Sequence, residues 1–322
     1  METILKIKYI LGKKFFNFLR LLPFSISLSF LEVFCLAILT YYITLITNQS
    51  LEDFENSFNF SKKITSDKIL FSQILIVIFF VKFVYQTVVT YLISKFTFSE
   101  KRNIQSQLVN GYMNLDYKDF KKKTLDEINE TVQKRVGHYI NSINILFKFV
   151  GDFFMTVLIL IFLLNLNLIA FIVMMMLVST LFIFYNLGLS KNISKYGKEA
   201  TIASKKIFKT VYEGFKSFKE IKFLKKENFF FKEFIKAADI EYSNFIKLNF
   251  LNSLPRPIFE LLIIFALVIF VMMLPIIGVN EQKLITVLIA FGLSALRLIP
   301  SITQLSKSFN AFKFNSFSVD SI

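Results

Sequence analysis

Residues 69–116 read ILFSQILIVIFFVKFVYQTVVTYLISKFTFSEKRNIQSQLVNGYMNLD, with one glycine, Gly111, and no proline. The first half can cross a bilayer, because a hydrocarbon core of about 30 Å needs about 20 apolar helical residues. Apolar residues then recur at helical spacing, for example at Phe96, Ile104 and Leu108. The stretch therefore predicts one helix of about 70 Å that spans the membrane and continues well beyond it.

The composition of the whole chain also indicates a membrane protein. Its 322 residues are 54% hydrophobic and 19% charged, and the mean hydropathy is +0.56. A soluble protein of this size cannot bury so large an apolar fraction in its core. Cys35 and His138 are the only cysteine and histidine, so the sequence has no disulfide framework and no Cys/His spacing of a metal or haem site. We predict no metal site and no catalytic residue.

Working outward from residues 69–116, six apolar segments qualify, or nearly qualify, as membrane spans. The predicted spans are 21–47, 69–93, 143–164, 168–187, 255–277 and 284–300. Only residues 165–167 separate the third span from the fourth, which predicts a tight hairpin. The expected fold is an all-α membrane protein with six transmembrane helices and long cytoplasmic extensions.

The charges of the connecting segments predict the orientation. Four segments placed on one side hold thirty Lys and Arg residues and fifteen Asp and Glu residues: 1–20, 94–142, 188–254 and 301–322. The segments on the opposite side hold four basic and five acidic residues: 48–68, 165–167 and 278–283. Basic loops stay in the cytoplasm, so both termini are predicted to be cytoplasmic. This topology accounts for the net charge of +15 without a nucleic-acid partner.

The chain is expected to divide at residue 20. Residues 1–20 combine one broad apolar face with several lysines, which is typical of an interfacial helix on the inner leaflet. A frayed basic leader is the alternative. Residues 21–322 are expected to form a single transmembrane domain.

The two long cytoplasmic connections contain short turn regions near 113–128 and 212–224. The first has Leu115-x-Tyr117-x-x-Phe120 followed by Asp126-Glu127, and the second has Gly214-Phe215 followed by Lys219-Glu220. Here the chain resembles the transmembrane half of ABC exporters, in which two helical hairpins project inward and short coupling helices at their tips dock onto ATPase domains. The resemblance implies an ATPase-coupling role for seven residues: Leu115, Tyr117, Phe120, Gly214, Phe215, Lys219 and Glu220.

Three further motifs are similar to exporters that flip polyprenyl-diphosphate-linked oligosaccharides. They are SFLEVF at 29–34, LPRPIFE at 254–260 and ALRLIP at 295–300. The resemblance implies a homodimer in the bacterial inner membrane, a nucleotide-binding ATPase partner that holds ATP and Mg²⁺, and a lipid-linked saccharide as substrate.

Charged residues inside predicted spans are costly and are therefore functional candidates. Lys82, Arg256 and Arg297 fall in the inner half of the bilayer, and we interpret them as a cationic belt that faces an internal cavity. A guanidinium suits a phosphate edge, so the belt would bind a diphosphate headgroup, with Glu32 and Glu260 as neighbouring acids. The alternative, that Arg256 and Arg297 only neutralise Glu260, Glu32 and helix ends, stays open.

The sequence has no phosphate-binding loop, because Gly12-Lys13 and Gly197-Lys198 lack the upstream glycine and the following Ser or Thr. We therefore expect the ATPase to be a separate or fused partner domain, and the chain alone to bind and gate without hydrolysing ATP. A truncated, non-functional exporter half is one alternative.

The other alternative is a membrane-embedded polyprenyl-phosphate glycosyl- or phosphotransferase. Such chemistry normally uses clustered carboxylates, often with a divalent metal, at a membrane face. The best local cluster is Asp116, Asp119, Asp126 and Glu127. The position of this cluster in the first turn region favours the exporter.

Overall fold

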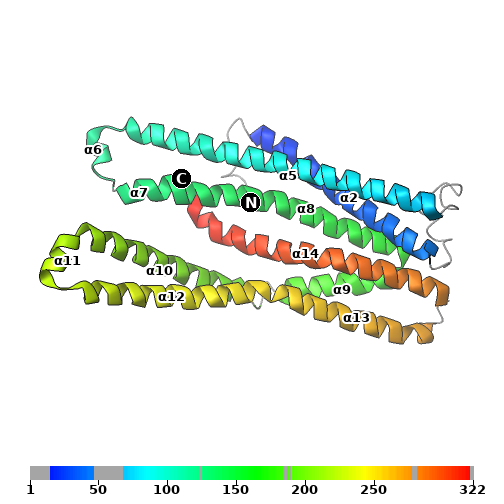
Figure 1. Cartoon of the computed structure of the whole chain (residues 1–322). Helices are drawn as coiled ribbons and strands as arrows, with labels where there is room; N and C mark the ends of the chain where they lie inside the picture. The colour runs from blue at the N-terminus through cyan, green and yellow to red at the C-terminus, as the bar shows by residue number, and fades with distance from the viewer. Residues whose placement is uncertain are drawn as a thin grey trace. The chain divides into compact units, whose positions relative to one another are not determined.

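The computed structural model describes residues 15–46, 68–123, 125–184, 188, 190–277 and 281–319. Every element within these residues is a helix, as predicted (Figure 1). The helices belong to two compact units, which we describe separately. The first unit comprises residues 1–179 and 259–322, and the second comprises residues 180–258.

The elements follow one another along the chain in this order: α2 (Phe15–Ile46), α5 (Lys68–Met113), α6 (Tyr117–Phe120), α7 (Leu125–Asn129), the π-helix η2 (Glu130–Arg135), α8 (Val136–Leu166), α9 (Leu168–Phe184), α10 (Ser190–Lys216), α11 (Phe218–Leu224), α12 (Glu227–Ser253), α13 (Pro255–Ile277) and α14 (Glu281–Val319). The predicted spans fall on α2, α5, α8, α9, α13 and α14.

Five helical stretches in the described part of the chain are long and apolar enough to cross a membrane. They are Phe15–Ile46, Ile69–Met113, Glu127–Leu166, Glu227–Phe265 and Val287–Ser308. A shorter apolar helix, Phe171–Thr180, lies on the predicted fourth span. The protein is therefore a multi-pass membrane protein, and the number of six spans remains a prediction.

Helix α5 confirms the prediction made from residues 69–116. It is a single helix of 46 residues, or about 69 Å at 1.5 Å per residue. It ends at Met113, three residues earlier than predicted, and both the backbone N–H and the side-chain amide of Asn114 donate to the Asn110 carbonyl oxygen, at 3.1 and 2.9 Å. Leu115 and Asp116 are outside the helix.

The first unit is built around α8, which packs against α2, α5 and α14. Ile159 and Leu163 lie one turn apart on α8 and are fully buried. Ala290 and Ala295 are buried on α14, and such small side chains allow two helix backbones to approach closely. At the other end of α8, Asn167 alone separates α8 from α9, which confirms the predicted tight hairpin.

Helices α5 and α8 stay together beyond the predicted spans. Ile104 of α5 belongs to the same buried cluster as Val136 and Tyr139 of α8. The Gln105 side-chain amide donates to the Val132 carbonyl oxygen of η2 at 3.0 Å. These contacts make the first inner connection a helical hairpin, with α6 at its tip (Figure 1).

The second unit is also a helical hairpin. Helices α10 and α12 run antiparallel and are joined by α11 (Figure 1). Ala203 of α10 and Ala237 of α12 are buried, and the Lys206 ammonium lies 3.1 Å from the Glu233 carboxylate. Both inner connections are therefore helical and contain a short helix at the turn.

The predicted boundary at residue 20 is not a helix boundary. Residues 15–20 belong to α2 and continue into the first predicted span without interruption. Residues 1–14, which form most of the predicted interfacial helix, lie outside the described residues.

Candidate functional sites at the hairpin tips and among the intramembrane charges

The first hairpin tip presents an aromatic side chain to solvent. Helix α6 begins after Asp116, whose carbonyl oxygen accepts hydrogen bonds of 2.9 Å from the Asp119 and Phe120 backbone N–H groups. Tyr117 is 80% exposed, and Leu115 and Phe120 are also exposed. An exposed apolar surface on a tip far from the apolar spans is typical of a protein-binding site.

The second tip is closed by backbone hydrogen bonds. The Ile221 N–H donates to the Ser217 carbonyl oxygen at 2.9 Å, and the Lys226 N–H donates to the Ile221 carbonyl oxygen at 3.1 Å. Between them, Lys225 adopts the left-handed conformation, with a φ of 52°. The Lys222 ammonium also pairs with the Glu227 carboxylate at 3.0 Å. The turn after α11 therefore has a defined geometry.

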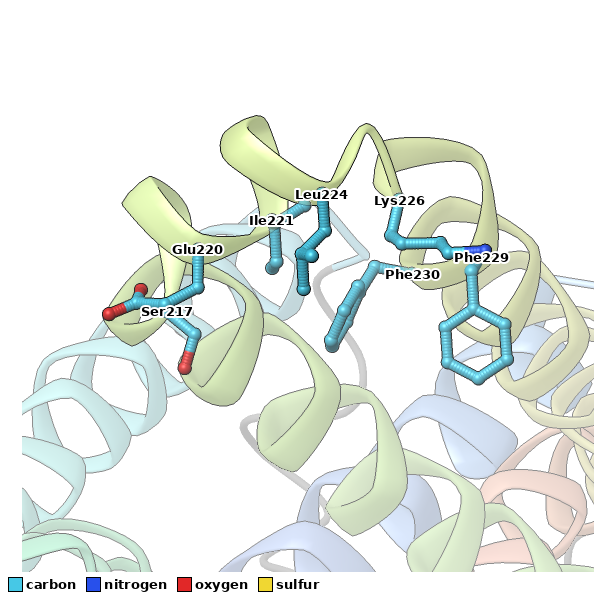
Figure 2. Close-up of a pocket in the computed structure, with 7 residues that line it drawn as sticks. All are labelled: Ser217, Glu220, Ile221, Leu224, Lys226, Phe229 and Phe230. Carbon is cyan, nitrogen blue, oxygen red and sulfur yellow. The ribbon is translucent and has the colours of Figure 1, made fainter.

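The underside of α11 forms an apolar groove of about 450 Å³. Figure 2 shows Ile221 and Leu224 pointing from α11 toward Phe230 of α12. Glu220 and Lys226 place one charge of each sign at the groove. Phe215 and Phe223 lie outside the groove lining and are 74% and 86% exposed.

The four predicted coupling residues of the second tip lie on two helices. Gly214 and Phe215 belong to the last turn of α10, whereas Lys219 and Glu220 lie in α11. Gly214 has an ordinary helical backbone conformation, and it lies beside the Phe230 ring. All four side chains are nevertheless at or beside the tip.

Two of the intramembrane charges form a buried ion pair. The Lys82 ammonium lies 3.5 Å from the Glu32 carboxylate, and their side chains are 7% and 13% exposed. Lys82 is 13 residues from Ile69, or about 20 Å along α5. A lone charge near the bilayer centre costs about 2.5–3.5 kcal/mol on insertion scales, so pairing offsets much of the cost of Lys82.

Arg297 lies near this pair, on α14. Helix α14 packs against α2, which carries Glu32. Arg297 is exposed, unlike Lys82. Arg256 and Glu260 are exposed on α13, on opposite sides of the boundary between the two units, so the structure does not relate Arg256 to the other two cations.

Comparison with known protein families identifies this arrangement of helices. Residues 22–299 match the ABC transporter transmembrane region. This match covers most of the chain, including α5, α8 and both hairpins. The chain belongs to this family.

An ABC transporter transmembrane region works with nucleotide-binding domains, so a partner of this kind is expected on family grounds. The hairpin tips carry exposed apolar side chains, among them Tyr117 and Phe223. The coupling residues predicted from the sequence lie at or beside these tips.

The carboxylates of the first tip bear on the alternative of a metal-dependent transferase. The Asp119 carboxylate pairs with the Lys122 ammonium at 2.7 Å. Within the part of the chain that the structure describes, no three acidic, cysteine or histidine residues are grouped to hold a metal ion. The Asp126 side chain is outside the described residues.

Several residues of these sites were missed in the sequence. Phe223 is the most exposed aromatic side chain of the second tip. The only feature of the sequence that could have indicated its exposure is that Phe223-Leu224 is followed directly by Lys225-Lys226. Ser27 of α2 and Tyr85 of α5 form a hydrogen bond between their hydroxyl groups. No spacing rule connects these two residues, because they belong to different helices.

Proposed function

We propose that this chain is the transmembrane subunit of an ATP-driven ABC exporter that flips a lipid-linked saccharide, or another anionic amphiphile, across the bacterial inner membrane. The observation that carries the proposal is the pair of helical hairpins whose short tip helices expose aromatic side chains. Two copies of the chain would enclose the transport path, and both termini would be cytoplasmic.

The tips would transmit movement from the ATPase partner. Tyr117 of the first tip and Phe215 of the second tip would insert into its surface, and Lys219 and Glu220 would fix the orientation by charge. Aromatic side chains buried at an interface contribute a large share of binding energy, which makes them suitable contact points. Energy would come from ATP and Mg²⁺ held by the partner.

Because α5 is one helix, displacement at its tip would be carried to the spans. Helix α5 continues from the first tip to the predicted outer end of span two and bears Lys82 on the way. A rotation of the hairpin would therefore change the surroundings of Lys82 and of the α2 residues that face it. This connection is the proposed route from ATP hydrolysis to the transport site.

The intramembrane cations would bind the anionic headgroup. Arg297 is exposed, and a guanidinium can donate two parallel hydrogen bonds to a phosphate. Lys82 and Arg256 would add positive charge, while the lipid tail remained in the bilayer. The positive-inside distribution of the loops supports the cytoplasmic side as the place where such a headgroup is first bound.

Reconstitution tests this function. The full chain and its nucleotide-binding partner would be placed in phosphatidylcholine vesicles with a fluorescent polyprenyl-diphosphate saccharide. The proposal predicts that ATP moves the saccharide to the opposite leaflet and that the lipid raises the ATPase rate. A vesicle preparation in which ATP is hydrolysed equally with and without the chain, and no saccharide moves, would contradict it.

A further inference from the structure

Three polar contacts tie α2 to α5 within the predicted membrane region. Tyr42 and Ser72 form a hydrogen bond of 2.9 Å. The Glu32–Lys82 ion pair lies nearly three helical turns further along, and the Ser27–Tyr85 hydrogen bond follows it. Their order shows that the two helices run antiparallel along a seam made partly of polar contacts.

The ion pair is the only one of these contacts that joins two full charges. It involves a single carboxylate oxygen at 3.5 Å, and little of either side chain is exposed. The Phe79 ring lies 5.9 Å from the Lys82 ammonium and shields it further. Lys82 is therefore neutralised before any ligand arrives, whereas Arg297 is exposed on α14, which packs against α2.

We propose that Glu32 is an internal counter-anion, which holds Lys82 while the transport site is empty and is displaced by the phosphate group of the ligand. This inference rests on the proposed function, and it changes the role of Glu32 from ligand-binding residue to competitor. The ligand would first meet Arg297 and would reach Lys82 only as α2 and α5 separate.

The exchange would select for ligand charge. A neutral lipid offers nothing to replace the Glu32 carboxylate, so Lys82 would lose its counter-ion if the seam opened. A phosphate restores the charge balance at Lys82 and releases Glu32. When a binding-competent state is only fractionally populated, the apparent affinity falls by that fraction, so the ion pair weakens binding. Removing the Glu32 charge should therefore strengthen it.

Equilibrium binding of radiolabelled farnesyl diphosphate to the full chain tests this exchange, in nanodiscs of phosphatidylcholine. We expect Glu32→Gln to lower the half-saturating concentration about tenfold. Glu32→Asp, which keeps the charge and retracts it by one methylene, should give a smaller gain. Lys82→Met should lose most of the binding, and the double variant Glu32→Gln/Lys82→Met should show no gain over it. Lys148→Met, a control for another cation of the predicted spans, should bind like the wild type.

Two further ligands show whether the lipid tail or the phosphate group of farnesyl diphosphate is recognised. Farnesol carries the same tail without charge and should not gain affinity in Glu32→Gln. Inorganic diphosphate carries the charge without the tail, so a gain with farnesyl diphosphate alone assigns the ligand to a lipid, and a gain with both assigns the exchange to the phosphate itself. Either result supports displacement of Glu32.

Unchanged or weaker binding of farnesyl diphosphate by both Glu32→Gln and Glu32→Asp would overturn the inference, as would an equal gain with farnesol. The proposed function would survive that result if the chain still stimulated its ATPase partner, because the hairpin tips do not include Lys82. If the wild type failed to stimulate the partner, the proposed function itself would be wrong.

Discussion

Gly214 and Phe230 lie against each other where α10 and α12 meet at the second tip. A Cβ atom added to Gly214 would be 3.7 Å from the Phe230 Cδ1 atom, which is ordinary van der Waals contact. The glycine is thus part of the helical packing rather than of the turn.

Gly214→Ala should stabilise the second hairpin by about 1 kcal/mol, because alanine has the higher helix propensity and its methyl group fits against Phe230. Hydrogen–deuterium exchange of residues 210–230 in the full chain measures the change. Gly111→Ala in α5 is the matched control, because a Cβ atom there would meet nothing within 4 Å. It should slow amide exchange in its own helix by a similar factor. Faster exchange around residue 214 would show that the site does not accept a methyl group.

Lys225→Gly should also stabilise the second tip, by about 1 kcal/mol, since glycine adopts the left-handed conformation without the steric penalty of a side chain. Lys226→Gly removes the same charge at a position with a negative φ and should give no gain. Exchange protection of α11 compares the two variants. An equal effect of both would mean that charge, and not backbone conformation, determines the stability of the turn.

Removing one partner of the Glu32–Lys82 pair should destabilise the first unit by about 3–5 kcal/mol, because a buried charge loses its counter-ion. The double variant Glu32→Leu/Lys82→Met removes both charges and should recover most of that loss. Thermal unfolding of the full chain in detergent measures each variant. A double variant as unstable as the worse single variant would indicate that the two charges do not act as a pair.

The sole histidine predicts a pH dependence of stability. Burial, followed by the Lys134 charge, lowers the pKa of His138 below its usual value of 6.5. The folded state therefore binds fewer protons than the unfolded state, so stability is full above about pH 6.5 and falls as the pH is lowered through the folded-state pKa. Unfolding temperatures at pH 7.5 and 5.5 should show this loss in the wild type. They should differ less in His138→Gln, and an unchanged difference would assign the effect to another group.

The long helices were predictable because they depend on local sequence. Between Ile69 and Met113 no proline occurs and Gly111 is the only glycine, so nothing interrupts the backbone hydrogen bonds of α5. The turn at Asn167 followed from the short polar break between two apolar segments. Gly214 was assigned to the second turn region through the family resemblance, whereas its contact with Phe230 depends on a partner helix.

The contacts between helices could not be predicted in the same way. The sequence identified Lys82 and Glu32 as costly intramembrane charges, yet their pairing depends on how α2 and α5 are rotated about their axes. The Ser27–Tyr85 hydrogen bond had no signal, because each residue alone is common in an apolar helix. The exposure of Phe223 depends on the direction in which α11 leaves α10.

The central claim is that the hairpin tips transmit force between the membrane helices and an ATPase partner. Its most direct test is the ATP hydrolysis rate of the partner reconstituted with the full chain, as wild type, as Tyr117→Ser/Phe215→Ser, and as Tyr242→Ser, an exposed aromatic control on α12 away from the tips. The account predicts that the tip variant loses stimulation by about tenfold or more while the control keeps it. Equal stimulation by the tip variant and the wild type would contradict the account.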